Sequence, residues 1–283
     1  MIDLEGIPAS NDNSTLWGEG LLTDIQVVEV YTATWCENCV DSEHALMESL
    51  EGKNATVLVH HRYIGESQDP FGSQEGDDRW IEFYGEGSNE SVGMARAPPT
   101  VVFDGSRMKV GSTPHGDSLY SDYSQMFADK HEYSNMPGGD VSMQWDGNNS
   151  TGVFHFNFNA PDGLPLDLIW NHRLMVVEHS AYFPEGSNGL EYYEDVVRAV
   201  FDLTTGEVHT STDDGYASEW SGPLTLPAAW DGNDLSLVLV HEWLRPAPDC
   251  CAEDSEEDSG LLPSFLAPLG IIAMGAAALT RRD

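Results

Sequence analysis

Two cysteines separated by two residues are the clearest chemical signal in this chain. Cys36 and Cys39 lie in the segment Trp35-Cys36-Glu37-Asn38-Cys39, after a predicted buried strand and at the start of a predicted helix. The unpaired N–H groups and partial positive charge of a helix N-terminus stabilise a thiolate. Two intervening residues let the second thiol resolve a mixed disulfide formed by the first. The spacing therefore predicts thiol–disulfide exchange, with Cys36 attacking and Cys39 resolving.

Other uses of this cysteine pair remain open. A C-x-x-C is also half of a zinc site, but residues 24–134 contain no second C-x-x-C and no H-x-x-x-H. Two unlinked core cysteines are a further alternative, disfavoured by the Trp-Cys pair that opens a helix directly after a strand. His60 and His61, near the motif, raise copper handling as another alternative. We expect no metal and no bound cofactor, because one dithiol exchanges electrons directly with another.

The surrounding residues predict alternating strands and helices. Buried runs rich in β-branched residues indicate strands, and apolar residues at helical spacing indicate helices. The predicted order is β-α-β-α-β-β-α, with strands at 25–31, 56–61, 100–103 and 108–110, and helices from the cysteines to about 50, at 77–84 and at 117–131.

The segments YTATWCENC at residues 31–39 and APPT at residues 97–100 resemble the thioredoxin superfamily. The resemblance implies an α/β thioredoxin fold over residues 24–134. It also implies a cis peptide bond before Pro99, in a loop that faces the cysteines and aligns an extended substrate chain. The catalytic residues it implies are Cys36, Cys39 and Pro99, and the supporting residues are Trp35, Glu37, Asn38 and Thr100.

The chain is most similar to secreted or surface-attached thioredoxin-fold proteins of the outer-membrane-protein and lipoprotein kind, in which a β-rich domain follows. That similarity rests on Asp69-Pro70-Phe71, Arg79, Phe83-Tyr84, Pro99-Thr100, Phe103-Asp104-Gly105, Val197-Arg198 and Gly206-Glu207.

Two features depart from the thioredoxin pattern. The family's buried carboxylate, six residues before the first cysteine, is replaced by Val30, and strand alternation turns the adjacent Glu29 to the opposite face. Deprotonation of Cys39 then relies on water or on another group. Glu37 and Asn38 occupy the positions between the cysteines, and the Glu37 charge opposes formation of the Cys36 thiolate. A less stable thiolate makes the couple more reducing, so we hypothesise a reductase or isomerase bias.

The second half has a different pattern. After a break at Met136-Pro137-Gly138-Gly139, apolar and polar residues alternate, most clearly at Phe154, Phe156 and Phe158. Alternation with period two is typical of a half-buried strand, and we interpret the phenylalanines as core. Short strands separated by turns predict an all-β antiparallel sandwich over residues 140–246, with strand-like runs at 141–145, 154–158, 174–178, 196–203, 222–226 and 235–242.

The two ends predict an anchored, external protein. Residues 261–280 carry no charge and are long enough to cross a bilayer, so we expect a single C-terminal transmembrane helix. Residues 281–283 contain two arginines and favour a cytoplasmic end, and residues 247–260 form an acidic tether that contains Cys250 and Cys251, whose role stays open. Residues 1–23 form an N-terminal extension without the features of a signal peptide, so we expect that a signal is missing from this chain.

The charge balance excludes one class of partner. Lysine and arginine total 12 against 48 acidic residues, a formal net charge of −36. Such a surface repels phosphate, so we expect no nucleic acid partner. We expect an enzyme, a membrane-anchored thiol–disulfide oxidoreductase whose partners are protein dithiols and disulfides. The alternative is a redox-inactive surface binding protein with a thioredoxin fold; the oligomeric state stays open.

Overall fold

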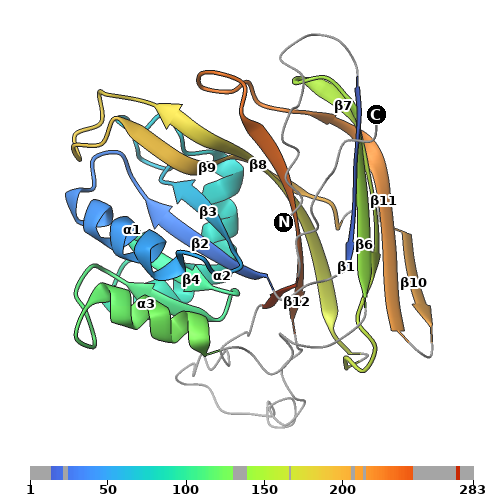
Figure 1. Cartoon of the computed structure of the whole chain (residues 1–283), viewed down its shortest axis with the longest axis horizontal. Coiled ribbons are helices and arrows are strands. Elements are labelled where there is room, and N and C mark those ends of the chain that lie inside the picture. Colours follow the sequence, from blue (N-terminus) through green and yellow to red (C-terminus); the bar gives the residue numbers. More distant parts are fainter. Residues whose placement is uncertain are drawn as a thin grey trace, which may run out of the picture.

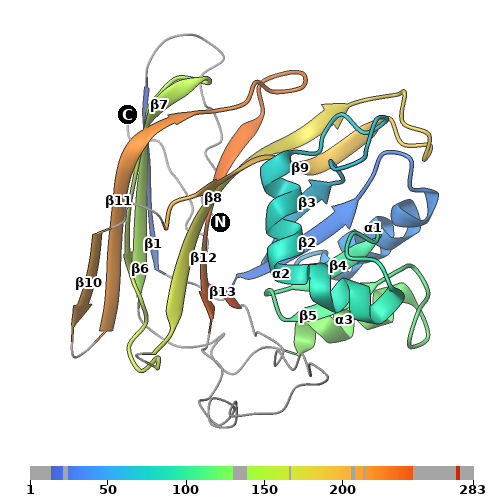
Figure 2. The same cartoon turned by 180° about the vertical axis from the view of Figure 1, so that it is seen from behind.

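A computed structural model describes residues 14–21, 25–129, 139–165, 167–204, 208–212, 215–244 and 272–274. These residues form two β-sheets and three α-helices, shown from opposite sides in Figures 1 and 2. Cys250, Cys251 and the acidic tether lie outside the described residues.

The predicted order of elements around the cysteines is confirmed. The first part of the chain contains, in order, β2 (Gln26–Thr32), α1 (Glu37–Leu50), β3 (Ala55–His61), α2 (Gln74–Val92), β4 (Thr100–Phe103), β5 (Arg107–Val110) and α3 (Leu119–Ala128). Helix α2 is longer than predicted. The hydroxyl of Ser73 caps it by accepting a hydrogen bond from the Gly76 N–H, and Gly93, with φ of 75°, ends it.

Helices cover both faces of this part of the sheet. On one face α1 and α3 bury a core with residues of β2, β3 and β4, among them Val28, Val30 and Val59. On the other face Trp80 and Tyr84 of α2 pack against Tyr31 and Val102. The alternation of β2 therefore directs Val30 to the α1 face and Glu29 to the α2 face, as predicted.

The strands of the second half do not fold apart from this sheet, and the prediction of a separate sandwich domain is wrong in this respect. Strands β8 (Ile169–Tyr182), β9 (Tyr192–Asp202), β12 (Leu235–Leu244) and β13 (Ile272–Met274) continue it, giving the strand order β13-β12-β8-β9-β3-β2-β4-β5. The connection is a parallel pairing of Val59 in β3 with Val196 in β9. Strands β8 and β12 are apolar on both faces, so they need a covering layer on each side.

A second sheet supplies one of these layers, as Figure 1 shows. Its strands are β1 (Ser14–Leu21), β6 (Asp140–Gly147), β7 (Thr151–Asn159), β10 (Val208–Thr212) and β11 (Gly215–Thr225). Their order is β1-β6-β7-β11-β10, and all pairs are antiparallel. The alternating Phe154, Phe156 and Phe158 of β7 are buried against β8 and β12, so their prediction as core is confirmed. Two antiparallel layers do pack face to face, but one of them, made of β8, β9 and β12, belongs to the same sheet as β2 and β3.

The predicted membrane helix receives no support from the described residues. Among them, no helix is both long and apolar enough to cross a membrane. Of residues 261–280 only β13 (Ile272–Met274) is described, and it is a strand paired with β12 where a helix was predicted. An extended apolar segment can pair with the open N–H and C=O groups of an edge strand. The rest of the predicted helix lies outside the described residues.

A buried network of charges joins the helical part to β12. The Arg79 guanidinium of α2 contacts the Glu29 carboxylate of β2 at 2.7 Å and the Glu242 carboxylate of β12 at 2.5 Å. Tyr84 also donates to Glu29, and the His60 ring lies 3.0 Å from it. Despite the opposing effect of burial, Arg79 and His60 hold the pKa of Glu29 well below its usual value. The carboxylate therefore stays charged inside the protein.

Candidate redox site

Cys36 and Cys39 form a disulfide at the start of α1. Cys36 is the N-cap residue and Cys39 lies one turn inside the helix. Cys39 is fully buried and Cys36 is 7% exposed, so Cys36 is the sulfur that a substrate can approach. This difference agrees with the predicted order of attack.

Three other predicted site residues, Trp35, Glu37 and Asn38, lie next to the cysteines in the sequence. Trp35 packs against the buried cluster of Ala33, Cys36 and Cys39, and its indole N–H donates to the Glu66 carboxylate at 2.5 Å. Glu37 and Asn38 are exposed in the first turn of α1. Although burial raises it, hydrogen bonds from Gln68 and Trp35 hold the pKa of Glu66 below its usual value, so Glu66 adds a second negative charge near the motif.

The Pro99 loop lies at the same end of the sheet as the cysteines. Strand β4 is antiparallel to β2, and Thr100 at its start pairs with Tyr31 near the end of β2. The Pro98–Pro99 peptide bond is cis, as the resemblance implies. Thr100 is buried, and its hydroxyl donates to the Ala97 carbonyl at 2.6 Å.

Hydrogen bonds to Asp69 hold the loop that leads into the cysteines. Asp69 accepts hydrogen bonds from the Thr34 backbone N–H at 2.8 Å and from the Phe71 backbone N–H at 3.0 Å. The His61 ring nitrogen Nδ1 lies 2.7 Å from the same carboxylate. A carboxylate only accepts, so His61 carries its proton on Nδ1. Asp69-Pro70-Phe71 makes a turn, and that turn holds the redox loop.

The second half of the chain reaches the same loop. The hairpin between β8 and β9 brings the Asn188 backbone N–H to 3.1 Å from the Thr34 carbonyl. The Tyr193 hydroxyl donates to Asn188 Oδ1 at 2.8 Å and to the Thr34 carbonyl at 3.4 Å. Burial and the charges of Asp69 and Glu43 raise the pKa of Tyr193 to about 12, which keeps it a donor.

The close contact between the β8–β9 hairpin and Thr34 requires a glycine at position 186. A Cβ at Gly186 would lie 2.0 Å from the Tyr193 hydroxyl oxygen and 3.1 Å from the Thr34 carbonyl oxygen. Any side chain at Gly186 would push Tyr193 away from the redox loop.

A carboxylate that sequence reasoning missed lies one turn after the cysteines. Glu43 of α1 is four residues beyond Cys39, and it accepts a hydrogen bond from the Thr32 hydroxyl at 2.5 Å. Burial raises the pKa of Glu43, while Thr32 and His61 act in the opposite direction. A cavity of about 150 Å³ is lined by Glu43, His61 and Val30 among others.

His60 and His61 do not form a pair of ligands. His60 turns to Glu29 on the α2 face, whereas His61 turns to Asp69. In the described part of the chain no three or more histidine, cysteine, aspartate or glutamate side chains gather as a metal site.

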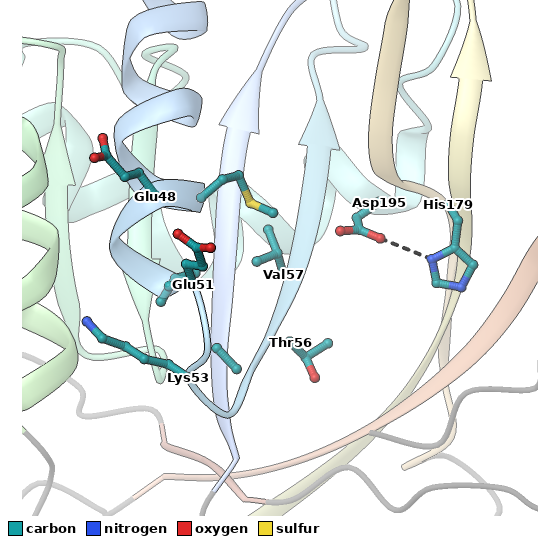
Figure 3. A pocket seen from close by; sticks show the side chains of 10 residues that line it. Glu48, Glu51, Lys53, Thr56, Val57, His179 and Asp195 are labelled. Carbon is teal, nitrogen blue, oxygen red and sulfur yellow. Dashed lines mark hydrogen bonds and ion pairs between the residues drawn. The ribbon is translucent and has the colours of Figure 1, made fainter.

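A larger pocket, of about 640 Å³, lies at the opposite end of β3 from His61 (Figure 3). Its wall includes Glu48, Glu51 and Lys53 from the end of α1 and the following turn, and His179 and Asp195 from β8 and β9, which lie 3.1 Å apart. The pocket shares Met47, Val57 and Asp195 with the smaller cavity. Its mixed charges favour no one class of ligand.

Sequence reasoning missed Asp69, Glu43 and Tyr193 as parts of the site. The only sequence signal for Asp69 was its position before Pro70, and an Asp-Pro pair is typical of a turn. Glu43 lies among polar helix residues that look solvated, and Tyr193 lies 159 residues from Thr34. Contacts at such separation have no local pattern.

Comparisons with known proteins bear on the fold alone. No family model matches the chain, and no curated protein has a matching sequence. Among solved structures, HBP35 of Porphyromonas gingivalis superposes with a TM-score of 0.54 at 14% identity, over 90% of this chain and 85% of that one. A protein of Agrobacterium tumefaciens gives a TM-score of 0.43 at 12% identity, over 92% of this chain and 97% of that one, a superposition too loose to argue from. The chain thus shares with HBP35 the arrangement of a mixed α/β sheet and an antiparallel sheet.

Proposed function

We propose that this protein is a thiol–disulfide oxidoreductase that acts on protein disulfides through Cys36 and Cys39. The observation that carries the proposal is a disulfide between the N-cap residue and the first turn of α1, with only Cys36 reaching the surface. A helix N-terminus stabilises the thiolate that attacks. Pro99 is proposed to align the substrate chain, since its loop lies at the same end of the sheet.

The direction of electron flow follows from charge. Glu37 and Glu66 are both near the motif, and negative charge disfavours the Cys36 thiolate. The resulting couple favours reduction or isomerisation of substrate disulfides over their formation. We keep this bias as part of the proposal, together with an external location of the protein.

Reduction of insulin by the protein in the presence of dithiothreitol tests the activity. Aggregation of the freed insulin chain should be faster with the wild type than with Cys36→Ser, whereas Cys39→Ser should accumulate a mixed disulfide that mass spectrometry detects. Equal and negligible rates for the wild type and Cys36→Ser would favour a redox-inactive binding protein instead.

A further inference from the structure

The proposed function leaves one proton without an acceptor. Cys39 must lose the proton of its thiol before its sulfur attacks the mixed disulfide, because the thiolate is the nucleophile. Cys39 is fully buried, so bulk water does not reach it. A base for this second step presupposes the proposed function and does not affect the first step.

Glu43 is the acid best placed to receive the proton. It follows Cys39 by four residues on α1, which makes the two side chains neighbours on one helix face. Side chains on a helix lean toward its N-terminus, so the Glu43 carboxyl leans toward Cys39. The hydrogen bond from Thr32, at the end of β2, holds the carboxyl at this end of the sheet.

The other acids near the motif are directed elsewhere. Asp69 already accepts from Thr34, Phe71 and His61. Glu29 is on the α2 face with Arg79, Glu66 accepts from Trp35, Ser67 and Gln68, and Glu37 is exposed. These arrangements leave Glu43 as the carboxylate beside Cys39 on the α1 face.

The cavity beside Glu43 gives the proton a way out. Val30 of β2, the position where thioredoxins carry a buried carboxylate, lines this cavity. Glu43 of α1 lines it too, so α1 supplies the carboxylate that β2 lacks. His61 lines it as well, and its buried Nε2 has no hydrogen-bond partner among the described residues. A cavity of about 150 Å³ with polar groups on its wall has room for water.

We propose that Glu43 accepts the thiol proton of Cys39 in the resolving step. Cys36 first attacks the substrate disulfide as a thiolate, and one substrate sulfur leaves as a thiolate that takes a proton from solvent. The Cys39 proton then moves to the Glu43 carboxylate and the Cys39 sulfur attacks Cys36. The bond between Cys36 and the substrate breaks, and the second substrate thiolate leaves. Two electrons pass from the protein dithiol to the substrate, and another dithiol later restores them.

Several titratable groups face Glu43 and will shape its pH dependence. They are His44 on α1, Tyr123 on α3, His61 on β3, Asp69 in the following loop and Tyr193 on β9.

Rapid mixing of the reduced protein with 5,5′-dithiobis(2-nitrobenzoate) separates the two steps, since each step releases one coloured thiolate. Glu43→Gln should leave the first release unchanged and slow the second by about 100-fold at neutral pH, the usual contribution of a positioned base. Its second rate should then rise about tenfold per pH unit, as a thiol without a base requires. Glu43→Asp should recover part of the rate.

Two further variants test whether the slower second release of Glu43→Gln comes from a change in structure. Glu48→Gln removes an exposed carboxylate of the same helix and should change neither release. Thr32→Val keeps the Glu43 carboxylate but removes its donor, so the second release should become fast only at higher pH.

The outcomes separate the two hypotheses. A normal first release with a second release that Glu43→Gln leaves unchanged at every pH overturns the role of Glu43 alone. A wild type without a first release overturns the proposed function, and this inference with it.

Discussion

The Tyr193 hydroxyl donates a hydrogen bond to the backbone carbonyl of Thr34, which lies directly before the Trp35-Cys36 pair. Thr34 therefore has partners on two sides, since Asp69 accepts from its N–H. Asp69 comes from the helical part of the chain and Tyr193 from strand β9 of the second half. The redox loop is built by both halves of the chain.

From this relationship we predict that residues 25–129 do not fold alone. Leu58 and Val27 are buried against Met175, Val197 and other residues of the second half, and they would face water in the fragment. We expect the fragment to show no cooperative transition in urea, whereas the full chain unfolds cooperatively. Circular dichroism during urea titration is the measurement, and a fragment with a sigmoidal transition would contradict the prediction.

The sequence predicts the elements better than their assembly. The order β-α-β-α-β-β-α depends on local periodicity and capping, and these signals are strong around the cysteines. The continuous apolar run in β8, from Leu174 to Val177, and the run from Leu237 to Val240 in β12 already indicate burial on both faces. Such runs do not identify the covering layers. The pairing of Val59 with Val196 was therefore unpredictable from one sequence.

The site residues likewise include some that the sequence predicts and one that it does not. Cys36, Cys39 and Pro99 belong to short motifs with a local chemical meaning. Glu43 was missed because a glutamate in a polar helix is most often solvated, and its burial depends on Thr32 and on the strands beneath it. Only the three-dimensional arrangement distinguishes Glu43 from Glu48 on the same helix.

Glu37→Gln should make the disulfide more oxidising. Removal of a negative charge next to Cys36 stabilises its thiolate and thus the reduced form. One pKa unit corresponds to about 30 mV for this two-electron couple, so we expect a rise of about 10–30 mV in the reduction potential.

Equilibration with glutathione buffers measures this shift. Asp41→Asn, an exposed change one turn further along α1, should shift the potential less, and 1 M salt should reduce the difference because it shortens the screening length. A lower potential in Glu37→Gln would mean that the charge does not act on the thiolate.

Arg79→Met should destabilise the fold strongly. The change leaves Glu29 and Glu242 buried without their shared cation, and breaking a buried ion pair costs about 3–5 kcal/mol. Lys53→Met, at an exposed position where the ammonium lies 4.7 Å from the centre of the Phe127 ring, should lower the free energy of unfolding by no more than about 1 kcal/mol. Urea unfolding of both variants gives the comparison.

The loss in Arg79→Met should depend on pH. The folded-state pKa of Glu29 lies below its usual value of 4.5, so its contribution to stability is present above that pH and is lost on acidification. The deficit of Arg79→Met should therefore be largest at neutral pH and shrink below about pH 4.5. A deficit that is constant from pH 7 to pH 3 would show that Arg79 acts through packing and not through charge.

Glu43→Gln should stabilise the protein at neutral pH, opposite to its effect on the resolving step. Because burial raises the pKa of Glu43 above the usual 4.5, the folded state binds the Glu43 proton more tightly than the unfolded state. The wild type therefore has the full contribution of this group below that pH and loses it as the pH rises through the folded-state pKa. Glutamine carries no charge at any pH and avoids this loss. Unfolding in urea should give equal free energies for both proteins in acid and a higher value for Glu43→Gln at pH 7. Lower stability of the variant at every pH would mean that the hydrogen bond from Thr32 outweighs the burial of the charge.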